Sequence, residues 1–294
     1  MRPLLVLVGP TASGKSSAAI PVARALGAEI LSLDSMLLYR GMDVGTDKPV
    51  DLGDIPHHGI DLLDPAERFD TRRYLRNAGA AIADIQRRGH EVLVVGGTAL
   101  YLVSLLKGMF EGPPRDAQFR EELDRIASPD LHVRLEAVDP VMAERLHPND
   151  RRRITRALEV HALTGRALSD LQREWDGPDR FPSRIAGVRR PREEVRARIE
   201  RRVDEMLDRG LVEEVRGLEL GPTAAQGVGY KEVLGYLRDE YDLAEARRLI
   251  IRNTGRLARR QETWFKRLDV HWIDGNASDL VEQLIDFYRG STVQ

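Results

Sequence analysis

The sequence contains no cysteine, and this absence excludes several kinds of chemistry at once. A chain of 294 residues without a thiol forms no disulfide, no zinc site with thiolate ligands and no cysteine nucleophile. Such a composition is compatible with a reducing compartment. We therefore expect a protein without a disulfide framework.

Long apolar runs are missing as well. The first residues, MRPLLVLVGPTA, place an arginine before an apolar run as a secretion signal does, but the apolar part, Leu4–Val8, is too short for one. It leads directly into a glycine-rich loop, so we predict a buried strand there. No stretch approaches the length that spans a membrane. We expect a cytoplasmic protein without membrane contact.

A strong excess of one charge is also absent. The formal net charge is -2, with 42% hydrophobic and 31% charged residues, which is typical of a soluble globular protein. The arginines nevertheless concentrate in two segments, 147–160 and 247–267. A charge run is usually only a solvated face. Two such runs in a nearly neutral chain favour a local surface for a polyanion, with Trp264 or Phe265 available to stack on a base.

The order of the predicted elements indicates an α/β fold. Strands alternate with helices, which predicts a mainly parallel sheet that binds ligands at the carboxyl ends of its strands. Between 115 and 182 the pattern is helical and contains no convincing strand. We therefore predict a core of residues 1–114 and 183–294 and an inserted helical subdomain of residues 115–182. The predicted strands are 4–8, 29–33, 91–95, 184–188 and 270–273, and the main core helices end near 26, 88, 107 and 209.

The stretch GPTASGKSS, 9–17, matches the pattern of a phosphate-binding loop. Its glycines permit a tight turn, so the backbone N–H groups of 12–16 can point at phosphate oxygens, and the start of the following helix adds partial positive charge. The loop could also be an ordinary turn, but its place between an apolar strand and a helix favours phosphate binding. Lys15 supplies a full charge, and the hydroxyl of Ser16 can bind Mg²⁺.

Two further turns follow predicted strands. Enzymes that use ATP with this loop commonly carry an acidic residue after a second strand, whereas one strand here ends in residues 96–98, Gly-Gly-Thr. Thr98 either contacts a phosphate or substrate or only caps a helix. Asp34 is either a general base or partner of a metal, or the cap of a short helix. Arg198 and Arg202, four residues apart, either reach a diphosphate or form surface ion pairs.

These stretches together resemble the bacterial tRNA dimethylallyltransferase family, whose members are also called tRNA isopentenylpyrophosphate transferases. The resemblance implies a P-loop NTPase-like core with a helical insertion. It also implies transfer of a dimethylallyl group from dimethylallyl diphosphate to N6 of adenosine 37 in tRNA, with Mg²⁺ as cofactor. The matching stretches run in order along the chain: GPTASGKS (9–16), DSMLLYRGMDVGTDKP (34–49), VGGTALYL (95–102), HPND followed by RALE (147–159), VGYKE (228–232) and LARRQETWFKR (257–267).

The resemblance also implies roles for single residues. Asp34 would accept the proton of the adenine amine, and Thr98 would line the channel where the substrates meet. The diphosphate would contact Gly9, Thr11, Ala12, Ser13, Gly14, Lys15, Ser16 and Arg202, with Ser16 also binding the metal. The tRNA anticodon stem-loop would contact Asp34, Ser35, Met36, Leu37, Arg120, Arg152, Arg153, Arg156, Gly229, Tyr230, Lys231, Arg259, Arg260, Gln261, Trp264 and Lys266.

One position departs from the family pattern. Relatives usually have a basic residue after a threonine before LARRQ, whereas this chain has Gly255 after Thr254. This difference puts one RNA or substrate contact and the local stability of the helix in question. No long apolar seam is visible, so we expect a monomer.

Three other functions share parts of this pattern. An adenylate isopentenyltransferase would need the phosphate loop but no basic surface for an anticodon. A small-molecule kinase would use ATP in the loop, with the arginines near 151–156 as a phosphate lid. An RNA-binding protein without catalysis would leave Asp34 and the loop without a role. Salt-dependent binding of tRNA separates the first of these from a tRNA-modifying enzyme.

Overall fold

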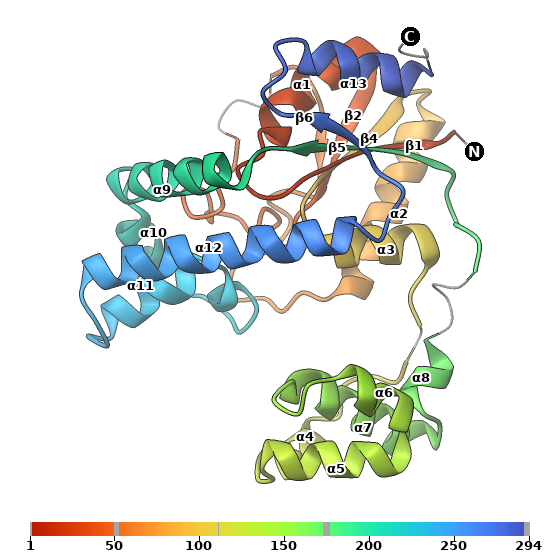
Figure 1. The fold of residues 1–294 in the computed structure, drawn as a ribbon, viewed down its shortest axis with the longest axis vertical. Helices are drawn as coiled ribbons and strands as arrows, with labels where there is room; N and C mark the ends of the chain where they lie inside the picture. The colour runs from red at the N-terminus through yellow and green to blue at the C-terminus, as the bar shows by residue number, and fades with distance from the viewer. Residues whose placement is uncertain (1, 50–52, 111, 173–176, 291–294) are drawn as a thin grey trace. The chain divides into compact units, whose positions relative to one another are not determined.

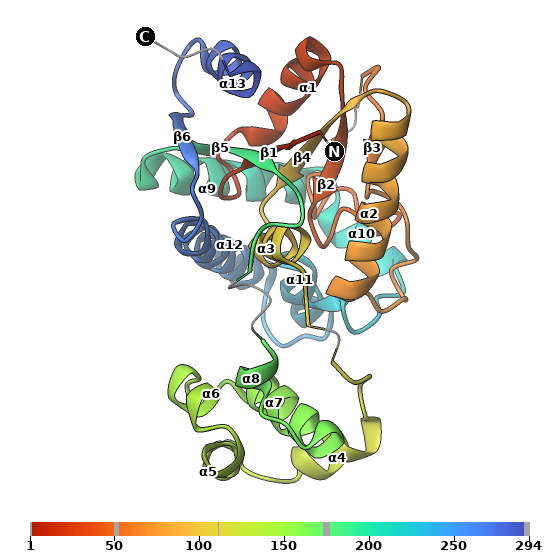
Figure 2. The same cartoon turned by 90° about the vertical axis from the view of Figure 1, so that its right-hand side faces the viewer.

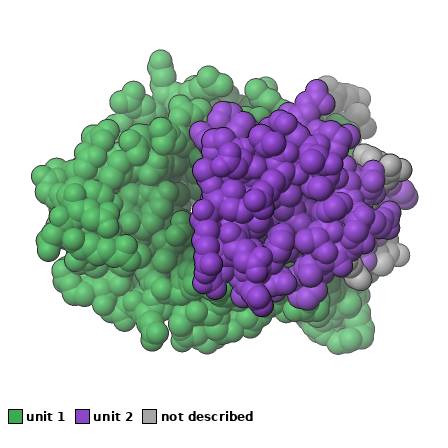
Figure 3. Space-filling view, turned by 90° about the horizontal axis from the view of Figure 1, so that it is seen from below, with its two compact units in different colours: residues 1–102, 181–294 green, residues 103–180 purple. Residues whose placement is uncertain are grey.

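The structure is a computed structural model that describes residues 2–49, 53–110, 112–172 and 177–290. The chain forms two compact units, one of residues 1–102 and 181–294 and the other of residues 103–180, which Figure 3 colours separately. Our division into a core and an insertion at 115–182 remains a prediction about domains. None of the described helices is long and apolar enough to cross a bilayer.

A parallel sheet organises the first unit. Its strands are arranged in the order β3-β2-β4-β1-β5-β6, and every neighbouring pair is parallel. This arrangement confirms the predicted α/β fold with a mainly parallel sheet flanked by helices (Figures 1 and 2). The prediction missed β3, because two residues are too few for a periodic pattern. The strands are β1 (Leu4–Val8), β2 (Ala28–Leu33), β3 (His57–His58), β4 (Glu91–Gly96), β5 (Ser183–Arg189) and β6 (His271–Asp274).

Helices cover both faces of this sheet (Figure 2). On one face, α1 (Lys15–Leu26) and α13 (Leu280–Arg289) share a core with β1, in which Leu7, Val22 and Leu284 are completely buried. Full burial of one such side chain contributes about 2 kcal/mol to folding. On the other face lie α2 (Thr71–Arg87) and α3 (Ala99–Lys107). These layers leave the carboxyl ends of the strands free to carry loops.

The remaining helices of the first unit come from the C-terminal part of the chain. They are α9 (Arg192–Asp208), α10 (Leu211–Gly217), α11 (Tyr230–Leu237) and α12 (Leu243–Phe265). A two-pronged ion pair joins α12 to α9: Arg247 donates to both carboxylate oxygens of Asp204, at 2.5 and 2.9 Å. Phe265 has no exposed surface, so the prediction that it could stack on a base is wrong. Trp264 remains partly exposed.

The second unit is helical. Its helices are α4 (Ala117–Asp124), α5 (Ser128–Val138), α6 (Pro140–Arg145), α7 (Arg151–Thr164) and α8 (Leu168–Leu171). Glu159 is completely buried in this unit and accepts hydrogen bonds from Arg120 at 2.7 Å and from Arg156 at 2.5 Å. Burial by itself would raise the pKa of Glu159, but these two arginines hold it at about 2. Both arginines therefore stabilise the unit, whereas Arg152 and Arg153 are exposed.

Gly255 lies inside α12, and a methyl group at this position would meet no other atom within 4 Å. We expect Gly255→Ala to raise the free energy of unfolding by about 0.5–1 kcal/mol, because alanine loses less backbone entropy in a helix. Urea unfolding measures the change. Gly235→Ala in α11 is the matched control, since its methyl would collide with Tyr241 and should lower stability. A gain at both positions would contradict the prediction.

Candidate functional site

A pocket of about 700 Å³ opens at the carboxyl ends of β1, β2 and β4. Loops after these strands form one side of it, and side chains of α9 and α12 form the other. It brings together the phosphate loop, Asp34, Thr98 and Arg202, which are far apart in the sequence. Ligand sites of parallel α/β sheets occupy this position.

Glycine is required at two positions of the phosphate loop. Gly14 has φ of 97°, a left-handed conformation that ends the loop and starts α1. A Cβ atom on Gly9 would lie 2.6 Å from the carbonyl oxygen of Val188. The first amides of α1, at Lys15 and Ser16, have no carbonyl one turn behind them in the helix and are therefore suited to an anion.

Three arginines from the C-terminal half hold successive residues of this loop. Nε of Arg190 donates to the carbonyl of Ser13 at 2.8 Å, and Nε of Arg198 donates to the carbonyl of Ala12 at 2.8 Å. Nη1 of Arg202 donates to Oγ1 of Thr11 at 2.9 Å. The loop carbonyls are thus bound by protein. The sequence alternatives for Arg198 and Arg202 are contact with a diphosphate or surface ion pairs, and neither includes these bonds to the phosphate loop, so contact with a diphosphate stays a prediction. Sequence reasoning also missed Arg190, which lies directly after β5.

Asp34 and Arg202 have opposite effects on the pKa of Lys15 in the pocket. Burial lowers the pKa of Lys15 to about 8; the carboxylate of Asp34 counteracts this shift, and the charge of Arg202 adds to it. Burial likewise lowers the pKa of Arg202, again opposed by Asp34. Oδ1 of Asp34 accepts the N–H of Met36 at 2.8 Å, which fixes the carboxylate at the end of β2. Lys15 and Arg202 thus repel each other, and Asp34 offsets part of this repulsion.

The lowered pKa of Lys15 predicts that the protein takes up protons when it binds an anion. The folded chain binds fewer protons at Lys15 than the unfolded chain between about pH 8 and 10.5, so its contribution to stability rises with pH there. A bound diphosphate favours the charged amine and raises this pKa. We expect pyrophosphate binding at about pH 8.5 to take up protons, and its affinity to fall as the pH rises above 8.

Calorimetry in two buffers with different ionisation enthalpies measures this uptake. Lys15→Arg is the control, because arginine stays charged and the contribution of the ligand's own protons is the same in both proteins. Equal proton uptake by wild type and variant would contradict the assignment.

The turn after β4 lies beside the end of β2. The N–H of Thr98 donates to the carbonyl of Leu33 at 3.1 Å, which places Thr98 in the pocket with Asp34. Gln261 of α12 also reaches this turn. Its Nε2 donates to the carbonyl of Gly97 at 3.1 Å, and its Oε1 accepts the N–H of Thr11 at 2.8 Å. The Gln261 amide, predicted from the resemblance to contact tRNA, is engaged within the protein.

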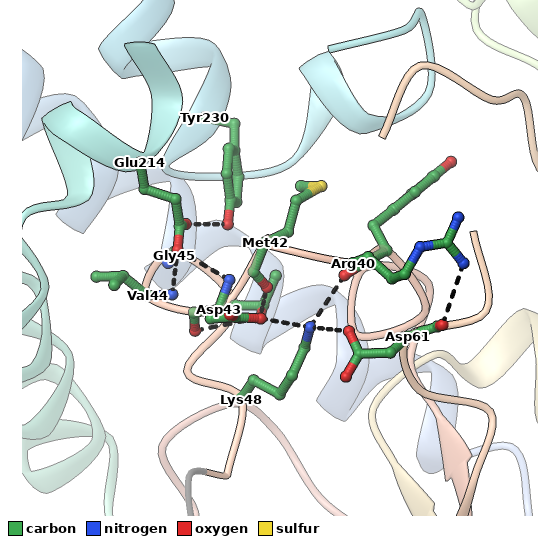
Figure 4. Close-up of polar contacts among 11 residues, drawn as sticks. Arg40, Met42, Asp43, Val44, Gly45, Lys48, Asp61, Glu214 and Tyr230 are labelled. Carbon is green, nitrogen blue, oxygen red and sulfur yellow. Dashed lines mark hydrogen bonds and ion pairs between the residues drawn. The ribbon is translucent and has the colours of Figure 1, made fainter. Parts of the chain in front are cut away.

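A loop of residues 42–48 forms the rim of the pocket next to α9, and Figure 4 shows how its backbone is held. The carboxylate of Glu214, on α10, accepts the hydroxyl of Tyr230 at 2.5 Å. It also accepts three consecutive backbone N–H groups, those of Asp43 at 2.9 Å, Val44 at 2.6 Å and Gly45 at 3.0 Å. Sequence reasoning missed Glu214, because an acid within a helix carries no signal of a distant loop.

Lys48 holds the other end of this loop (Figure 4). It is buried, and its Nζ donates to the carboxylates of Asp43 and Asp61, each at 2.5 Å, and to the carbonyl of Tyr39 at 2.9 Å. Asp47, between these anchors, forms an ion pair with Arg202. The rim is therefore connected to the phosphate loop through Arg202.

Glu214→Ala should destabilise this rim. The change leaves three adjacent N–H groups and the hydroxyl of Tyr230 without their acceptor, and we expect the free energy of unfolding to fall by about 3 kcal/mol. Urea unfolding measures the loss. Glu213→Ala is the matched control, because its side chain is 70% exposed and its ion pair with Arg216 lies on the surface. Equal decreases in the free energy of unfolding in both variants would show that the contacts of Glu214 do not stabilise the rim.

The predicted RNA-binding residues divide into three groups. Arg120, Arg152, Arg153 and Arg156 belong to the second unit. A second group does not line the pocket, and in it Lys231, Arg259 and Lys266 are exposed while Gly229 donates its N–H to Glu232. The third group lines the pocket: Asp34, Ser35, Met36, Leu37, Tyr230, Arg260, Gln261 and Trp264.

The described residues contain no cluster of three His, Asp or Glu side chains that could bind a metal by themselves. The pocket does expose the hydroxyl of Ser16 at the start of α1, near the amides suited to an anion. Mg²⁺ is commonly bound by few protein oxygens together with the phosphates of a substrate. The residues present fit a metal bound in that way.

Comparisons with known proteins agree along the whole chain. The family model described as IPP transferase matches residues 37–268, and that described as isopentenyl transferase matches residues 2–54. The tRNA dimethylallyltransferase 1 of Citrifermentans bemidjiense is 45% identical, over 97% of this chain and 96% of that protein. The tRNA dimethylallyltransferase of Geobacter metallireducens is also 45% identical, over 97% of each chain.

Solved structures are similar as well. The full-length tRNA isopentenylpyrophosphate transferase from Bacillus halodurans is 34% identical, with a TM-score of 0.74 over 99% of this chain and 97% of that one. A eukaryotic dimethylallyltransferase, described in crystallographic snapshots of its action on tRNA, is 26% identical, with a TM-score of 0.85 over 100% of this chain and 81% of that one. The present chain belongs to the IPP transferase family.

Proposed function

We propose that this protein transfers the dimethylallyl group of dimethylallyl diphosphate to N6 of adenosine 37 in tRNA. The observation that carries the proposal is the single pocket, in which a phosphate loop, the carboxylate of Asp34 and the base-sized side chain of Trp264 meet. A phosphate loop alone would suit many enzymes. A carboxylate in the same pocket, next to a helix with exposed arginines, suits transfer to a base of RNA.

The first task of the site is to stabilise the leaving group. The lone pair of N6 attacks C1 of the dimethylallyl group, and the bond from C1 to the bridging oxygen breaks, so that its electron pair leaves with the diphosphate. Lys15, Arg202 and the first residues of α1 line the pocket and would stabilise this growing charge. The metal would be held by Ser16 and diphosphate oxygens, where it would neutralise part of the same charge.

The second task is to remove a proton from the amine. The lone pair of an adenine amino group is delocalised into the ring, which makes it a poor nucleophile. As N6 bonds to carbon it becomes more acidic, and the carboxylate of Asp34 accepts its proton. Thr98, beside Asp34 in the pocket, lines the path on which the two substrates meet.

The third task is to bring the base to the pocket. A base stacked in the anticodon loop must be turned outward, which costs a few kcal/mol that contacts with the RNA offset. Exposed Arg259 on α12, exposed Lys266 directly after α12, and exposed Arg152 and Arg153 on α7 supply positive charge for the phosphates. We propose that Trp264 stacks on a base, and that the protein acts as a monomer in the cytoplasm.

The test combines unmodified tRNA with labelled dimethylallyl diphosphate, and offers AMP as the acceptor in a parallel reaction. In a third reaction, γ-labelled ATP is supplied with candidate acceptors. Label in tRNA but not in AMP is the expected result, and tRNA affinity should fall steeply as salt rises. Label in AMP alone would indicate an adenylate isopentenyltransferase. Transfer of phosphate from ATP with no reaction of tRNA would contradict the proposal.

A further inference from the structure

The side-chain amide of Gln261 is placed between two loops of the pocket. Oε1 accepts the N–H of Thr11 in the phosphate loop at 2.8 Å, and Nε2 donates to the carbonyl of Gly97 at 3.1 Å. One group thereby joins the loops after β1 and β4. The pairing also fixes the orientation of the amide, since Thr11 needs an acceptor and Gly97 a donor.

The same helix carries the residues proposed to contact RNA. Arg260 precedes Gln261 directly, and Trp264 follows it by three positions, so that all three line the pocket from α12. Arg259 is exposed on this helix. RNA that binds these residues therefore contacts the same helix that holds Thr11.

Thr11 is gripped from a second helix as well. Its hydroxyl accepts a hydrogen bond from Arg202 of α9 at 2.9 Å, while its N–H is held by Gln261 of α12. The ion pair of Arg247 with Asp204 ties α9 to α12. The two helices thus hold the N–H and the hydroxyl of Thr11 in the phosphate loop.

We propose, on the basis of the function proposed above, that Gln261 is a positioning residue that couples the two substrate sites: RNA bound to α12 fixes the Gln261 amide, which then sets the phosphate loop for the diphosphate. Thr11 precedes the amides of residues 12–16 directly, so its position decides where they point. When no RNA is bound to α12, the phosphate loop samples other arrangements, and diphosphate binding must restrict them. Bound RNA has already removed that freedom.

Coupling of this kind is reciprocal. We expect RNA to raise the affinity for diphosphate, and diphosphate to raise the affinity for RNA, by the same factor of about ten. The probes are inorganic pyrophosphate with Mg²⁺ and an unmodified anticodon stem-loop RNA. Calorimetry measures the affinity for each probe alone and in the presence of a saturating amount of the other.

Three variants separate coupling from stability. Gln261→Met keeps the length of the side chain and removes both hydrogen bonds, so the coupling factor should fall to about one. Gln261→Glu keeps an acceptor for Thr11 but places a second acceptor against the carbonyl of Gly97, so the factor should be intermediate. Thr263→Val, at an exposed position of the same helix, is the control and should retain the wild-type factor.

A purely structural role for Gln261 would weaken the binding of both probes without changing the coupling factor, which is the affinity for one probe in the presence of the other relative to its affinity alone. An unaltered factor in the folded Gln261→Met protein would overturn the inference, as would a wild-type factor of one. If Gln261→Met fails to fold, an unaltered factor in Gln261→Glu overturns it equally. Should wild type transfer label to tRNA and yet bind the two probes independently, the coupling is wrong and the proposed function stands; absence of transfer would refute the function itself.

Discussion

Asp34→Asn should lower the turnover of dimethylallyl transfer by about 10²–10⁴-fold at pH 7, because the amide cannot accept the proton of the amine. The variant is well suited to the question. Asparagine can still accept the N–H of Met36, a bond that Asp34 makes at 2.8 Å, so the turn after β2 keeps its shape. The substitution therefore removes the proposed base and keeps the local fold.

The measurement compares single-turnover rates at saturating substrates with tRNA affinity. RNA affinity should change by no more than about threefold, since Asp34 contributes no positive charge to the phosphate contacts. Because the carboxylate of Asp34 counteracts the lowered pKa of Lys15, its loss lowers that pKa further, so the rates are also compared well below pH 8, where the amine stays charged in both proteins. A rate near that of wild type would show that another group takes the proton.

Lys15→Met should lower kcat/KM for dimethylallyl diphosphate by about 10²–10³-fold, which is the usual loss when one group that stabilises a developing negative charge is removed. Methionine keeps most of the length of the side chain and removes only the charge and its hydrogen-bond donors. Nζ of Lys15 donates to the carbonyl of Pro10 at 3.3 Å, a weak contact, so the loop should persist without it.

The effect should be confined to the diphosphate side of the reaction. We expect tRNA affinity of Lys15→Met to stay close to wild type and its melting temperature not to fall, because the charged amine is partly desolvated in the folded protein, while binding of inorganic pyrophosphate weakens. A variant that binds pyrophosphate as tightly as wild type, or loses RNA binding instead, would place the diphosphate elsewhere.

Most of the fold could be predicted, because its signals are local. β1 is a continuous apolar run, Gly27 ends α1 in a left-handed conformation, and the phosphate loop lies between them as expected. β3 carried no such signal, since it consists of two residues and becomes a strand only by pairing with Ile30 and Leu31 of β2.

The candidate site could be predicted only in part. Arg156 lies in a basic segment and Arg120 is assigned to tRNA by the resemblance, and no sequence signal shows that both neutralise buried Glu159. Phe265 looks as available as Trp264, but the face of α12 on which it lies is packed in the core. A charge or a ring is visible in the sequence, whereas its partner depends on tertiary contacts.

The sequence by itself determined the local fold of the proposed anion site, because strand, glycine turn and helix start adjoin within residues 8–16 and depend on short-range geometry. Only the tertiary structure decided what surrounds it. The amide of Gln261 meets Thr11 across 250 positions, and the carboxylate of Glu214 meets Val44 across 170. Such pairs form because the order of the sheet and the packing of helices place the groups within reach, and hydrogen bonds act only over about 3 Å.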